Sequence, residues 1–580
     1  MDLFFSNSGG FSESRHVYID GNDLIDRWKN LNEGNFFTIG ELGFGAGLNF
    51  LSTWKAWSET DYKNKDLYFY SIDKNPIKIE DAKQVISKFK ELKSISDIYF
   101  TSYPINCKGA QRISFPEYNI HLTLHYSDII DSISSINSHK GFFDAWFLDG
   151  FSPDRNPEMW SKEIFKVLKK KSHAKTSFST FSSSNKIRNH LLELDATVNS
   201  KKGFANKKYM TNGVFNSRNQ SNNFKKKSVA IVGAGIAGCS LAHSLVKRGH
   251  KCTIFDQNKD LCGGASGNLA LISYPRLSAF DSPFSKFSAQ SFIYSTQFYE
   301  KFASKGWHKT GVLFLDTNDF SKKRIEDLIQ EKKDNNLYRP ISANEASTLS
   351  GTNINHNGLF FPSAGWIEPI QLCQDLINDP NIEVFLEEKV LKISHENYIH
   401  NLISNKKNYN FDEICLCNSF EAENLISIKG TRIKRGQITY IPTNKDISKL
   451  KMPICGKGYI SPLINDKHLV GATYSDNKDM IATESDSLEN LQILYDIFPD
   501  IHLNPKTSGE KVGLRATTID HLPIAGKSDN FYLNIGHGSR GSTSAPLCGE
   551  YIADLITGSP LPLDIETMNA ISIKRFNSKS

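Results

Sequence analysis

The chain has 580 residues, which allows about four domains of average size, although large α/β enzymes often divide this length into two or three. Its 39% hydrophobic and 23% charged residues are ordinary for a soluble globular protein, and it has no run of about 18 apolar residues that could span a membrane. The N-terminal residues lack the features of a secretory signal, and the nine cysteines form no CxxC pair. We therefore expect a cytoplasmic protein with reduced thiols and without a metal site.

A glycine-rich loop follows the first expected strand, within residues 36–50 (FFTIGELGFGAGLNF). The strand ends in Glu41, and a helix begins near Leu48. The loop between them carries Gly43, Gly45 and Gly47. Glycines at this spacing let the backbone approach a neutral nucleoside and an amino-acid group. The pattern is typical of class I methyltransferases that bind S-adenosylmethionine.

Two aspartates after later strands are candidates for further contacts with this cofactor. Asp73 ends an expected strand at residues 66–72, where a carboxylate can accept hydrogen bonds from ribose hydroxyls. Asp128 follows the strand IHLTLHYS (residues 120–127) and is a candidate for the adenine edge. An ordinary turn aspartate is the alternative for Asp128.

Residues 143–160, FDAWFLDGFSPDRNPEMW, place Asp149 directly after a buried strand. The carboxyl ends of strands in open α/β sheets are where such folds place their chemistry. Methyltransferases that act on nitrogen commonly have an acidic or amide side chain here, followed by proline and an aromatic residue, as in Phe151 and Pro153. A carboxylate at this position can orient the amine and accept its proton. Capping of the following turn is the alternative role for Asp149.

A basic stretch at residues 161–227 contains 16 Lys and Arg but only three acidic residues, a net charge of +13. Since the whole chain carries +6, the remainder carries −7. Phe204 and Tyr209 alternate with these cations, which suits a nucleic-acid face with charges on phosphates and rings on bases. A merely solvated surface remains the alternative. Residues 217–227, SRNQSNNFKKK, lack periodicity and are expected to form a linker.

A second nucleotide-binding pattern lies at residues 225–256. A strand at 228–232 leads into the G-x-G-x-x-G motif formed by Gly233, Gly235 and Gly238. A helix follows and ends near Gly249, and a second strand ends in Asp256. Strand, helix and acidic residue in register predict a dinucleotide site, with a pyrophosphate at the helix N-terminus and ribose hydroxyls on the carboxylate. A glycine turn in a ligand-free domain is the alternative.

The remaining sequence favours FAD over NAD, because it follows the layout of flavin amine oxidases. The small residues after Asp256 permit close approach to the ribityl and phosphate region of a flavin: Gly264, Ala265, Ser266, Gly267 and Asn268. Turns and strands of an antiparallel substrate domain are expected from Gly365 to Tyr474. The chain then returns to the cofactor through GHGSRGSTSAPL (residues 536–547), a turn that leads into a helix and contains Gly536, Gly538 and Gly541.

This ordered series of motifs resembles the MnmC family, bifunctional enzymes that modify the wobble uridine of tRNA. The matching segments are NSGGFSESRHVYIDGNDL (7–24), ELGFGAGLNF (41–50), FDAWFLDGFSPDRNPEMW (143–160), KGFANKKYM (202–210), GASGN (264–268) and GHGSRGSTSAPL (536–547). The resemblance implies that an FAD-dependent half removes the carboxymethyl group from 5-carboxymethylaminomethyl-(2-thio)uridine. A methyltransferase half then transfers methyl from S-adenosylmethionine to the exposed amine.

Glycine-oxidising flavoenzymes look similar at the GLR and GHGSR segments. That resemblance implies that Arg515 holds the substrate carboxylate as a planar bidentate partner, and that Arg540 lies beside flavin and substrate. Surface salt bridges are the alternative for both arginines. The family pattern has a glycine a few residues after GASGN, where this chain has Leu271.

The expected fold class is α/β, a class I methyltransferase Rossmann-like domain followed by an FAD-binding Rossmann domain with an interleaved antiparallel-sheet substrate domain. We predict a methyltransferase domain at 1–216, a linker at 217–227 and an oxidoreductase at 228–580. The nucleotide-binding parts of the oxidoreductase are expected at about 228–290 and 505–570. Two other functions stay open: a fused small-molecule amine oxidase and methyltransferase that does not act on RNA, and a non-catalytic tRNA-binding protein.

Overall fold

The structure is a computed structural model of the whole chain. It describes residues 9–576 except for 108, 137–141, 151–155, 220–224, 281, 332–335, 500 and 502–506. The chain divides into two compact units: unit 1 comprises Met1–Lys225 with Thr557–Glu566, and unit 2 comprises Lys226–Ile556 with Thr567–Ser580. All nine cysteines are free thiols. Within the described ranges, every helix is too short or too polar to traverse a lipid bilayer.

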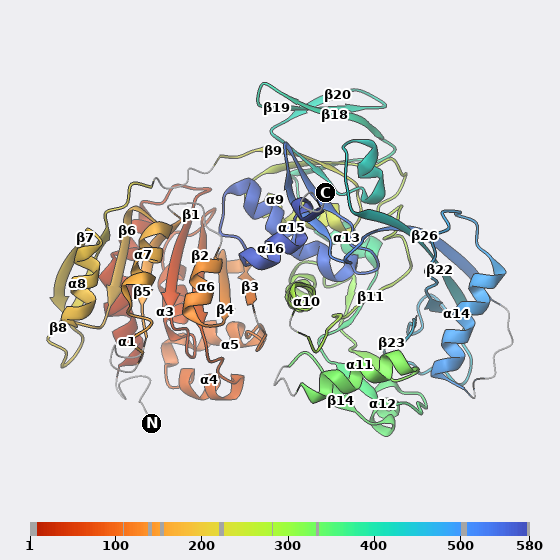
Figure 1. Ribbon diagram of the computed structural model, residues 1–580, viewed down its shortest axis with the longest axis horizontal. Coiled ribbons are helices and arrows are strands. Elements are labelled where there is room, and N and C mark those ends of the chain that lie inside the picture. Colours follow the sequence, from red (N-terminus) through yellow and green to blue (C-terminus); the bar gives the residue numbers. More distant parts are fainter. Residues whose placement is uncertain are drawn as a thin grey trace. The chain divides into compact units, whose positions relative to one another are not determined.

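Unit 1 is built on one eight-stranded sheet (Figure 1). Its strands, in spatial order, are β3 (Gly109–Phe115), β4 (Ile120–Tyr126), β2 (Asp66–Asp73), β1 (Phe36–Leu42), β5 (Phe143–Leu148), β6 (Ser172–Thr180), β8 (Tyr209–Phe215) and β7 (Ala196–Lys202). The run from β4 to β6 is parallel, whereas β3 and β8 pair antiparallel with their neighbours. The carboxyl ends of these five parallel strands therefore meet at one edge, where four of the strands place an acidic residue.

Helices cover both faces of this sheet. The α-helices of unit 1 before the linker are α1 (Gly10–Ser14), α2 (Leu24–Lys29), α3 (Leu48–Ser58), α4 (Ile79–Ile86), α5 (Lys93–Thr101), α6 (Ile129–Ser135), α7 (Lys162–Lys171) and α8 (Asn185–Glu193). Short turns of other helix types are η1 (Arg15–Ile19), η2 (Asp20–Asn22), η3 (Lys90–Leu92) and η4 (Pro116–Tyr118).

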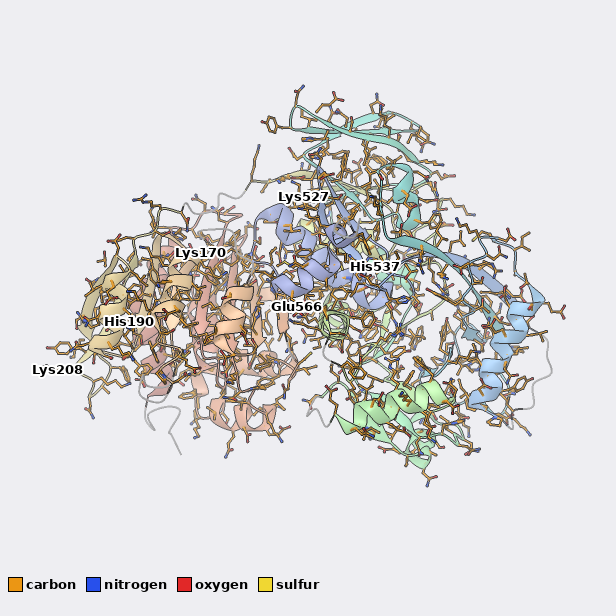
Figure 2. The ribbon with its side chains drawn as sticks, viewed as in Figure 1. Lys170, His190, Lys208, Lys527, His537 and Glu566 are labelled. Carbon is orange, nitrogen blue, oxygen red and sulfur yellow. The ribbon has the colours of Figure 1, made fainter. Side chains whose placement is uncertain are left out.

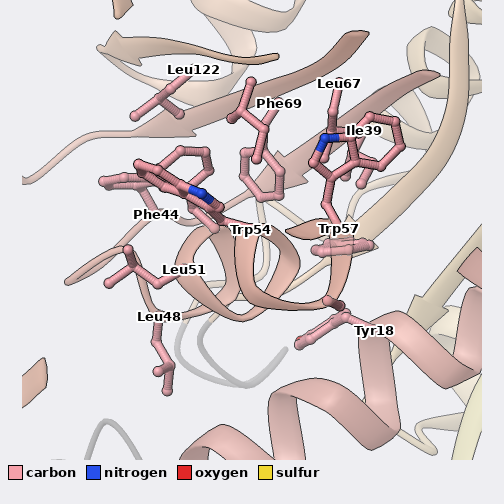
Figure 3. Close-up of a cluster of buried hydrophobic side chains, with 14 of the residues drawn as sticks. Tyr18, Ile39, Phe44, Leu48, Leu51, Trp54, Trp57, Leu67, Phe69 and Leu122 are labelled. Atoms are coloured by element: carbon pink, nitrogen blue, oxygen red, sulfur yellow. The ribbon is translucent and has the colours of Figure 1, made fainter. Parts of the chain in front are cut away.

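Aromatic side chains form much of the core between α3 and the sheet (Figure 3). Trp54 and Trp57 of α3 are fully buried, and the Phe50 ring packs against Phe69 of β2 with ring centroids 5.3 Å apart. Each such buried side chain contributes about 1.5–3 kcal/mol of hydrophobic stabilisation. The helix that starts at the first glycine loop is therefore held on the sheet mainly by its own apolar face.

Unit 2 contains a six-stranded sheet and a separate eight-stranded sheet. The first has the order β17 (Ile382–Phe385), β10 (Lys251–Phe255), β9 (Ser228–Val232), β21 (Glu413–Leu416), β28 (Phe531–Ile535) and β27 (Ile524–Ser528), and only β27 is antiparallel. The second has the order β14 (Arg339–Ile341), β15 (Gly358–Phe361), β13 (Val312–Leu315), β23 (Ile454–Cys455), β24 (Tyr459–Ile460), β25 (Lys467–Gly471), β22 (Thr431–Pro442) and β26 (Gly509–Thr518). It is antiparallel except where β13 pairs with β23.

Two small sheets and the remaining helices complete the described chain. One sheet has the order β11 (Leu271–Ser273), β16 (Gly365–Ile367) and β12 (Trp307–His308), and the other β18 (Val390–Glu396), β19 (Ile399–Ser404) and β20 (Asn408–Phe411). The helices are α9 (Ile236–Lys247), α10 (Pro283–Phe302), α11 (Asp319–Gln330), α12 (Ala343–Ser350), α13 (Pro369–Ile377), α14 (Glu484–Ile497), α15 (Gly541–Thr557) and α16 (Ile565–Ile571), with turns η5 (Ser419–Asn424) and η6 (Ile573–Phe576).

The predicted fold class is confirmed: two Rossmann-like parallel sheets are present, and a mainly antiparallel sheet lies within the second half of the chain. Strand β9 has the predicted bounds, and α9 ends just before Gly249, which adopts a φ of 77°. The sequence did not indicate that Thr557–Glu566 groups with unit 1. The Arg112 guanidinium donates a 2.7 Å hydrogen bond to Pro560 O, which gives a physical reason for that grouping.

A buried ion triad joins two helices of unit 2. Arg248, at the C-terminal end of α9, contacts Glu550 at 2.6 Å and Asp554 at 2.7 Å on α15. All three side chains are almost fully buried. Removal of the arginine would take away a cation that both carboxylates contact in a low-dielectric interior.

We expect Arg248→Ala to destabilise unit 2 by about 3–5 kcal/mol, because breaking a buried pair costs far more than breaking an exposed one. Thermal and urea unfolding of the purified protein would measure the loss. Lys247→Ala is the matched control, since Lys247 is exposed and only 3.9 Å from Asp379. Equal unfolding midpoints for the two variants would contradict the structural role of the triad.

Candidate active sites

The glycine loop of unit 1 is fixed by the carboxylate at the end of the neighbouring strand. Asp73 Oδ2 accepts hydrogen bonds from Phe44 N at 2.9 Å and Gly45 N at 2.8 Å. Gly43, Gly45 and Gly47 all have positive φ, which favours glycine. A Cβ at Gly45 would meet no atom within 4 Å, so open space lies beside the loop. The loop therefore fits the backbone approach that S-adenosylmethionine requires.

The two aspartates predicted to touch this cofactor have different surroundings. Asp73 accepts a third hydrogen bond from Asn75 N at 2.9 Å, and a carboxylate with about four acceptor positions keeps capacity for a ribose hydroxyl. Asp128 caps α6 through Ile130 N at 3.0 Å and pairs with Lys74 at 3.1 Å. These contacts lower the pKa of Asp128, the cap being the larger cause. They match the turn-aspartate alternative, and contact with adenine stays a prediction.

Asn49 connects Glu41 of β1 with Asp149, which follows β5. Its Nδ2 donates to Glu41 Oε1 at 2.9 Å and to Asp149 Oδ2 at 2.6 Å, while its Oδ1 accepts from Ser14 Oγ at 2.7 Å. Glu41 is 1% exposed and also accepts from Ser71 Oγ at 2.6 Å. Burial raises the pKa of Glu41 well above its usual range. Glu41 thus fixes the base of the site through protein partners, and its predicted contact with the cofactor stays a prediction.

Asp149 lies at the carboxyl end of β5, beside the glycine loop. A Cβ at Gly43 would lie 2.6 Å from Asp149 O, so the two segments are in direct contact. Burial raises the pKa of the Asp149 carboxyl to about 6, although the nearby Tyr18 hydroxyl and the Asn49 amide oppose that rise. The Tyr18 hydroxyl faces this carboxyl without completing a hydrogen bond of normal geometry. A carboxyl with this pKa is a suitable proton acceptor near neutral pH.

The turn between β7 and β8 reaches the same site from the basic stretch. His16 Nε2 donates to Lys202 O at 2.9 Å, and Lys207 Nζ contacts Glu13 at 2.8 Å. The Lys207 charge also acts to lower the pKa of Asp149. Lys208 projects from this turn at the outer end of the hairpin (Figure 2). Part of the basic stretch therefore borders the Asp149 site, whereas Phe151 and Pro153 lie outside the described residues.

The glycine loop of unit 2 is organised in the same way. Asp256 Oδ2 accepts from Ala234 N at 2.7 Å, and Oδ1 accepts from Asn258 N and Nδ2 at 2.8 Å each. Gly233 has a φ of 113°, and a Cβ there would meet Cys417 O at 2.7 Å. A Cβ at Gly238 would lie 1.9 Å from Gly233 O, so only glycine lets α9 pack this closely on the loop.

A cavity of about 800 Å³ opens from this loop inside unit 2, and we call it the main cavity. The predicted residues that line it are Gly233, Gly235, Asp256, Gly264, Ala265, Ser266, Asn268, Arg515, Gly536, Gly538, Arg540 and Gly541. Gly238 and Gly267 instead serve close packing, since a Cβ at Gly267 would meet Cys262 O at 2.5 Å. A Cβ at Gly264 would meet nothing within 4 Å, so this wall is free to be approached. The volume of the main cavity, its glycine-lined wall and the Asp256 carboxylate at one end fit FAD.

The far end of the main cavity is formed by the returning chain. Helix α15 begins at Gly541, and its first residues line the cavity, so its N–H groups are available to an anion or to a reduced flavin ring. His537 lies in the turn before α15 (Figure 2) and contacts Ser544 at 2.8 Å and Asn534 at 3.0 Å. Burial lowers the pKa of His537 to about 4, which keeps this imidazole neutral. Leu271 also lines the cavity, where the family pattern has glycine.

Arg515 enters the main cavity from β26 without an acidic partner among the residues that the structure describes. A Cβ at Gly436 would lie 2.5 Å from Arg515 Nη2, so this glycine of the paired strand β22 makes room for the guanidinium. Burial lowers the pKa of Arg515, opposed by the nearby Tyr459 and Tyr474. A half-buried cation that lacks a counter-ion is suited to a ligand carboxylate.

Arg540 is held beside Tyr274 in the same cavity. Its Nη1 donates to Tyr274 O at 3.1 Å, and its guanidinium carbon lies 4.4 Å from the centre of the Tyr274 ring. Sequence reasoning missed Tyr274, Gly436 and, in unit 1, Asn49 and Tyr18. Asn49 belongs to the segment ELGFGAGLNF. Its partners Glu41 and Asp149 are distant from each other in the sequence, so no local pattern predicts that Asn49 bonds to both.

The comparisons with known proteins divide the chain in two. Residues 228–555 match a family model described as FAD dependent oxidoreductase. Residues 90–216 match a family model described as S-adenosyl-L-methionine-dependent methyltransferase. The glycine loop of unit 1 precedes the second match, so its assignment rests on the geometry above.

Relatives align over essentially the whole chain. A protein of Legionella pneumophila (strain Lens) named tRNA 5-methylaminomethyl-2-thiouridine biosynthesis bifunctional protein MnmC is 31% identical, with 100% of this chain and 95% of that protein covered. A protein of Hahella chejuensis with the same name is also 31% identical, over 100% of this chain and 96% of its own length.

Solved structures resemble the second half of the chain in fold. Glycine oxidase from Geobacillus kaustophilus aligns with a TM-score of 0.52 and 19% identity, covering 60% of this chain and 99% of its own. L-proline dehydrogenase from P. horikoshii aligns with a TM-score of 0.52 and 17% identity, covering 61% and 99%. At these identities the likeness concerns the fold alone.

The raised pKa of Asp149 predicts a pH-dependent stability difference for Asp149→Asn. The folded pKa is about 6, above the value of about 3.9 for an unfolded chain, so the wild type loses stability as pH rises from 4 through 6. The asparagine variant does not titrate and should gain about 2–3 kcal/mol over wild type between pH 4 and pH 8. Unfolding midpoints at both pH values would measure this. Asp131→Asn, at an exposed position of α6, should show no such pH-dependent difference from wild type. A difference of equal size in this control would contradict the raised pKa of Asp149 as the cause.

Proposed function

The chain belongs to the MnmC family of bifunctional tRNA-modifying proteins, and on that premise we propose that it performs two successive reactions on the wobble uridine of tRNA. Unit 2 removes the carboxymethyl group from 5-carboxymethylaminomethyl-(2-thio)uridine. Unit 1 methylates the 5-aminomethyl product to 5-methylaminomethyl-(2-thio)uridine. The nine free thiols suit the cytoplasm, which we propose as the location. The half-buried Asp149 carboxyl, with a pKa of about 6, and the arginine-lined main cavity, each beside its own glycine loop, together carry this assignment.

In unit 2, Arg515 orients the substrate by its carboxylate. The bidentate fork of a guanidinium fixes both position and direction of a carboxylate, so the adjacent methylene is presented in one orientation. When bound, FAD supplies the two-electron oxidation of that C–H bond, and hydrolysis of the resulting substrate imine releases the acid fragment and the free amine. Arg540, held by Tyr274, adds positive charge beside the same position. Neutral His537 supports the turn that carries Arg540.

In unit 1, Asp149 receives the proton that the amine must lose. S-adenosylmethionine, when bound, supplies the electrophilic methyl group. Asn49 donates to the Asp149 carboxylate and is itself held by Ser14, so the carboxylate keeps one orientation toward the amine of the substrate. Because the pKa of Asp149 is about 6, the base is ionised at neutral pH but remains more basic than an exposed aspartate. The nitrogen that unit 2 frees from its carboxymethyl group is thus the nitrogen from which Asp149 takes the proton in unit 1.

Asp149→Asn should lower the rate of methylation by about 100-fold or more, because general-base catalysis contributes a factor of this order. Oxidation should be unchanged. Nucleoside analysis of tRNA treated with FAD and S-adenosylmethionine would show 5-aminomethyluridine accumulating. Wild-type protein without S-adenosylmethionine should give the same product. In the wild type, methylation should rise with pH through about 6, as the Asp149 pKa requires. Methylation by the variant at the wild-type rate would refute the role of Asp149.

Arg515→Met should lower kcat/KM for the carboxymethylaminomethyl substrate by about 10- to 100-fold, since hydrogen bonds to a charged group contribute about 1.5–3 kcal/mol. Methylation of tRNA that already carries the aminomethyl group should be unaffected. The same nucleoside assay measures both reactions. Arg432→Met is the matched control, because Arg432 is exposed on the neighbouring strand β22. Unchanged oxidation by Arg515→Met would rule out the carboxylate clamp, and activity on free amino acids but not on tRNA would favour the small-molecule alternative.

A further inference from the structure

A second groove, of about 530 Å³, adjoins the main cavity in unit 2, and we call it the side groove. Its walls come from residues 276–280 and 282–284 and from α11. Arg276, Phe320 and Arg324 line both the side groove and the main cavity. The two spaces therefore adjoin along these three side chains, and a strand in the side groove would lie next to the main cavity.

Two phenylalanine rings project from the walls of the side groove. Phe280 is 75% exposed and Phe320 is 68% exposed, the highest values among the phenylalanines that the structure describes. Phe280 lies in the segment before α10, whereas Phe320 belongs to the first turn of α11. Exposed rings on both sides of one groove offer flat apolar faces to a partner.

Three cations accompany these rings. Arg324 Nε and Nη2 donate to Leu277 O at 3.1 and 2.9 Å, so its guanidinium ties the two walls together. Burial lowers the pKa of Arg324 to about 10, with further contributions from repulsion by Arg540 and Arg276, and the group stays charged at neutral pH. Lys323 is exposed on α11. Across the described residues, none of these cations forms an ion pair.

Acidic groups do not cancel this charge. Asp520 borders the side groove, but its carboxylate is bound by Arg575 at 2.7 Å. Asp327, one helical turn beyond Lys323, is the other acidic residue in the described walls. Among the residues that the structure describes, the walls of the side groove therefore carry a net positive charge, which favours an anionic ligand.

We propose that the side groove binds the single-stranded nucleotides next to the substrate uridine of tRNA. This inference rests on the proposed oxidation by unit 2. Bases stack on Phe280 and Phe320, and phosphates contact Lys323, Arg276 and Arg324, the combination by which proteins hold single-stranded RNA. Because the side groove adjoins the main cavity, the neighbouring nucleotides can stay in the groove while one nucleotide enters toward Arg515. The side groove thus distinguishes tRNA from a free modified nucleoside.

Oxidation kinetics of the full-length protein, with FAD and substrate tRNA, test the rings. The Phe280→Ala/Phe320→Ala double variant should raise KM for tRNA by about 10-fold or more, because base stacking contributes about 1–3 kcal/mol per base. Oxidation of the free modified nucleoside by the Phe280→Ala single variant should stay within twofold of wild type, because Phe280 lines the side groove but not the main cavity. Tyr398→Ala is the control, since Tyr398 is 94% exposed in the β18–β19 turn. An unchanged KM for tRNA in the double variant overturns the proposal.

Binding of oligo(U) to the full-length protein tests the charges independently of activity. Lys323→Ala should reduce the slope of log K against log salt by about 0.7, the value for one phosphate contact on a single strand. Lys322→Ala, an exposed neighbour that does not line the side groove, should leave the slope unchanged. Equal slopes for both variants, or equally tight binding of polyglutamate, would overturn assignment to RNA. If the wild type bound oligo(U) in this manner but oxidised no tRNA, the proposed function alone would fail.

Discussion

The chain depends twice on one interaction: a carboxylate at the end of a second strand that accepts main-chain N–H groups from the glycine loop after the first. In unit 1 the pair is Asp73 with Phe44 and Gly45, and in unit 2 it is Asp256 with Ala234. A glycine loop has many accessible conformations, so such hydrogen bonds reduce the entropy that a ligand would otherwise have to remove. Each loop is preorganised by its own scaffold.

The chemistry diverges beyond these loops. In unit 1 the next polar group is Asp149, half-buried and sharing Asn49 with Glu41. In unit 2 the cavity continues toward Arg515 and Arg540, and the described walls at that end contain no acidic partner for them. Asp149 and Arg540 both follow the carboxyl ends of parallel strands, β5 and β28, where such folds gather functional side chains. Arg515 instead enters the cavity from β26 of the antiparallel sheet.

Much of this was predictable from sequence, because glycine motifs, strand ends and alternating helix faces are local signals. β9, α9 and α15 lie where the patterns placed them, and the antiparallel substrate sheet was expected. Asn49 was not identified, since its partners Glu41 and Asp149 come together only when β1 and β5 pair. Tyr274 and Gly436 were not identified from the sequence for the same reason, since their partners Arg540 and Arg515 are distant in the chain. The grouping of Thr557–Glu566 with unit 1 has no sequence periodicity to reveal it.

The Arg248 triad has a consequence for the spacing of the two helix N-termini that line the main cavity. Helix α9 starts at one glycine turn and α15 at another, and each directs the positive end of its dipole into the main cavity. Glu550 and Asp554 bind Arg248 far from those starts, and a Cβ at Gly549 would lie 3.0 Å from Leu241 N, so neither helix can slide along the other. These contacts hold the two helix N-termini, with their partial positive charges, at a constant separation along the main cavity.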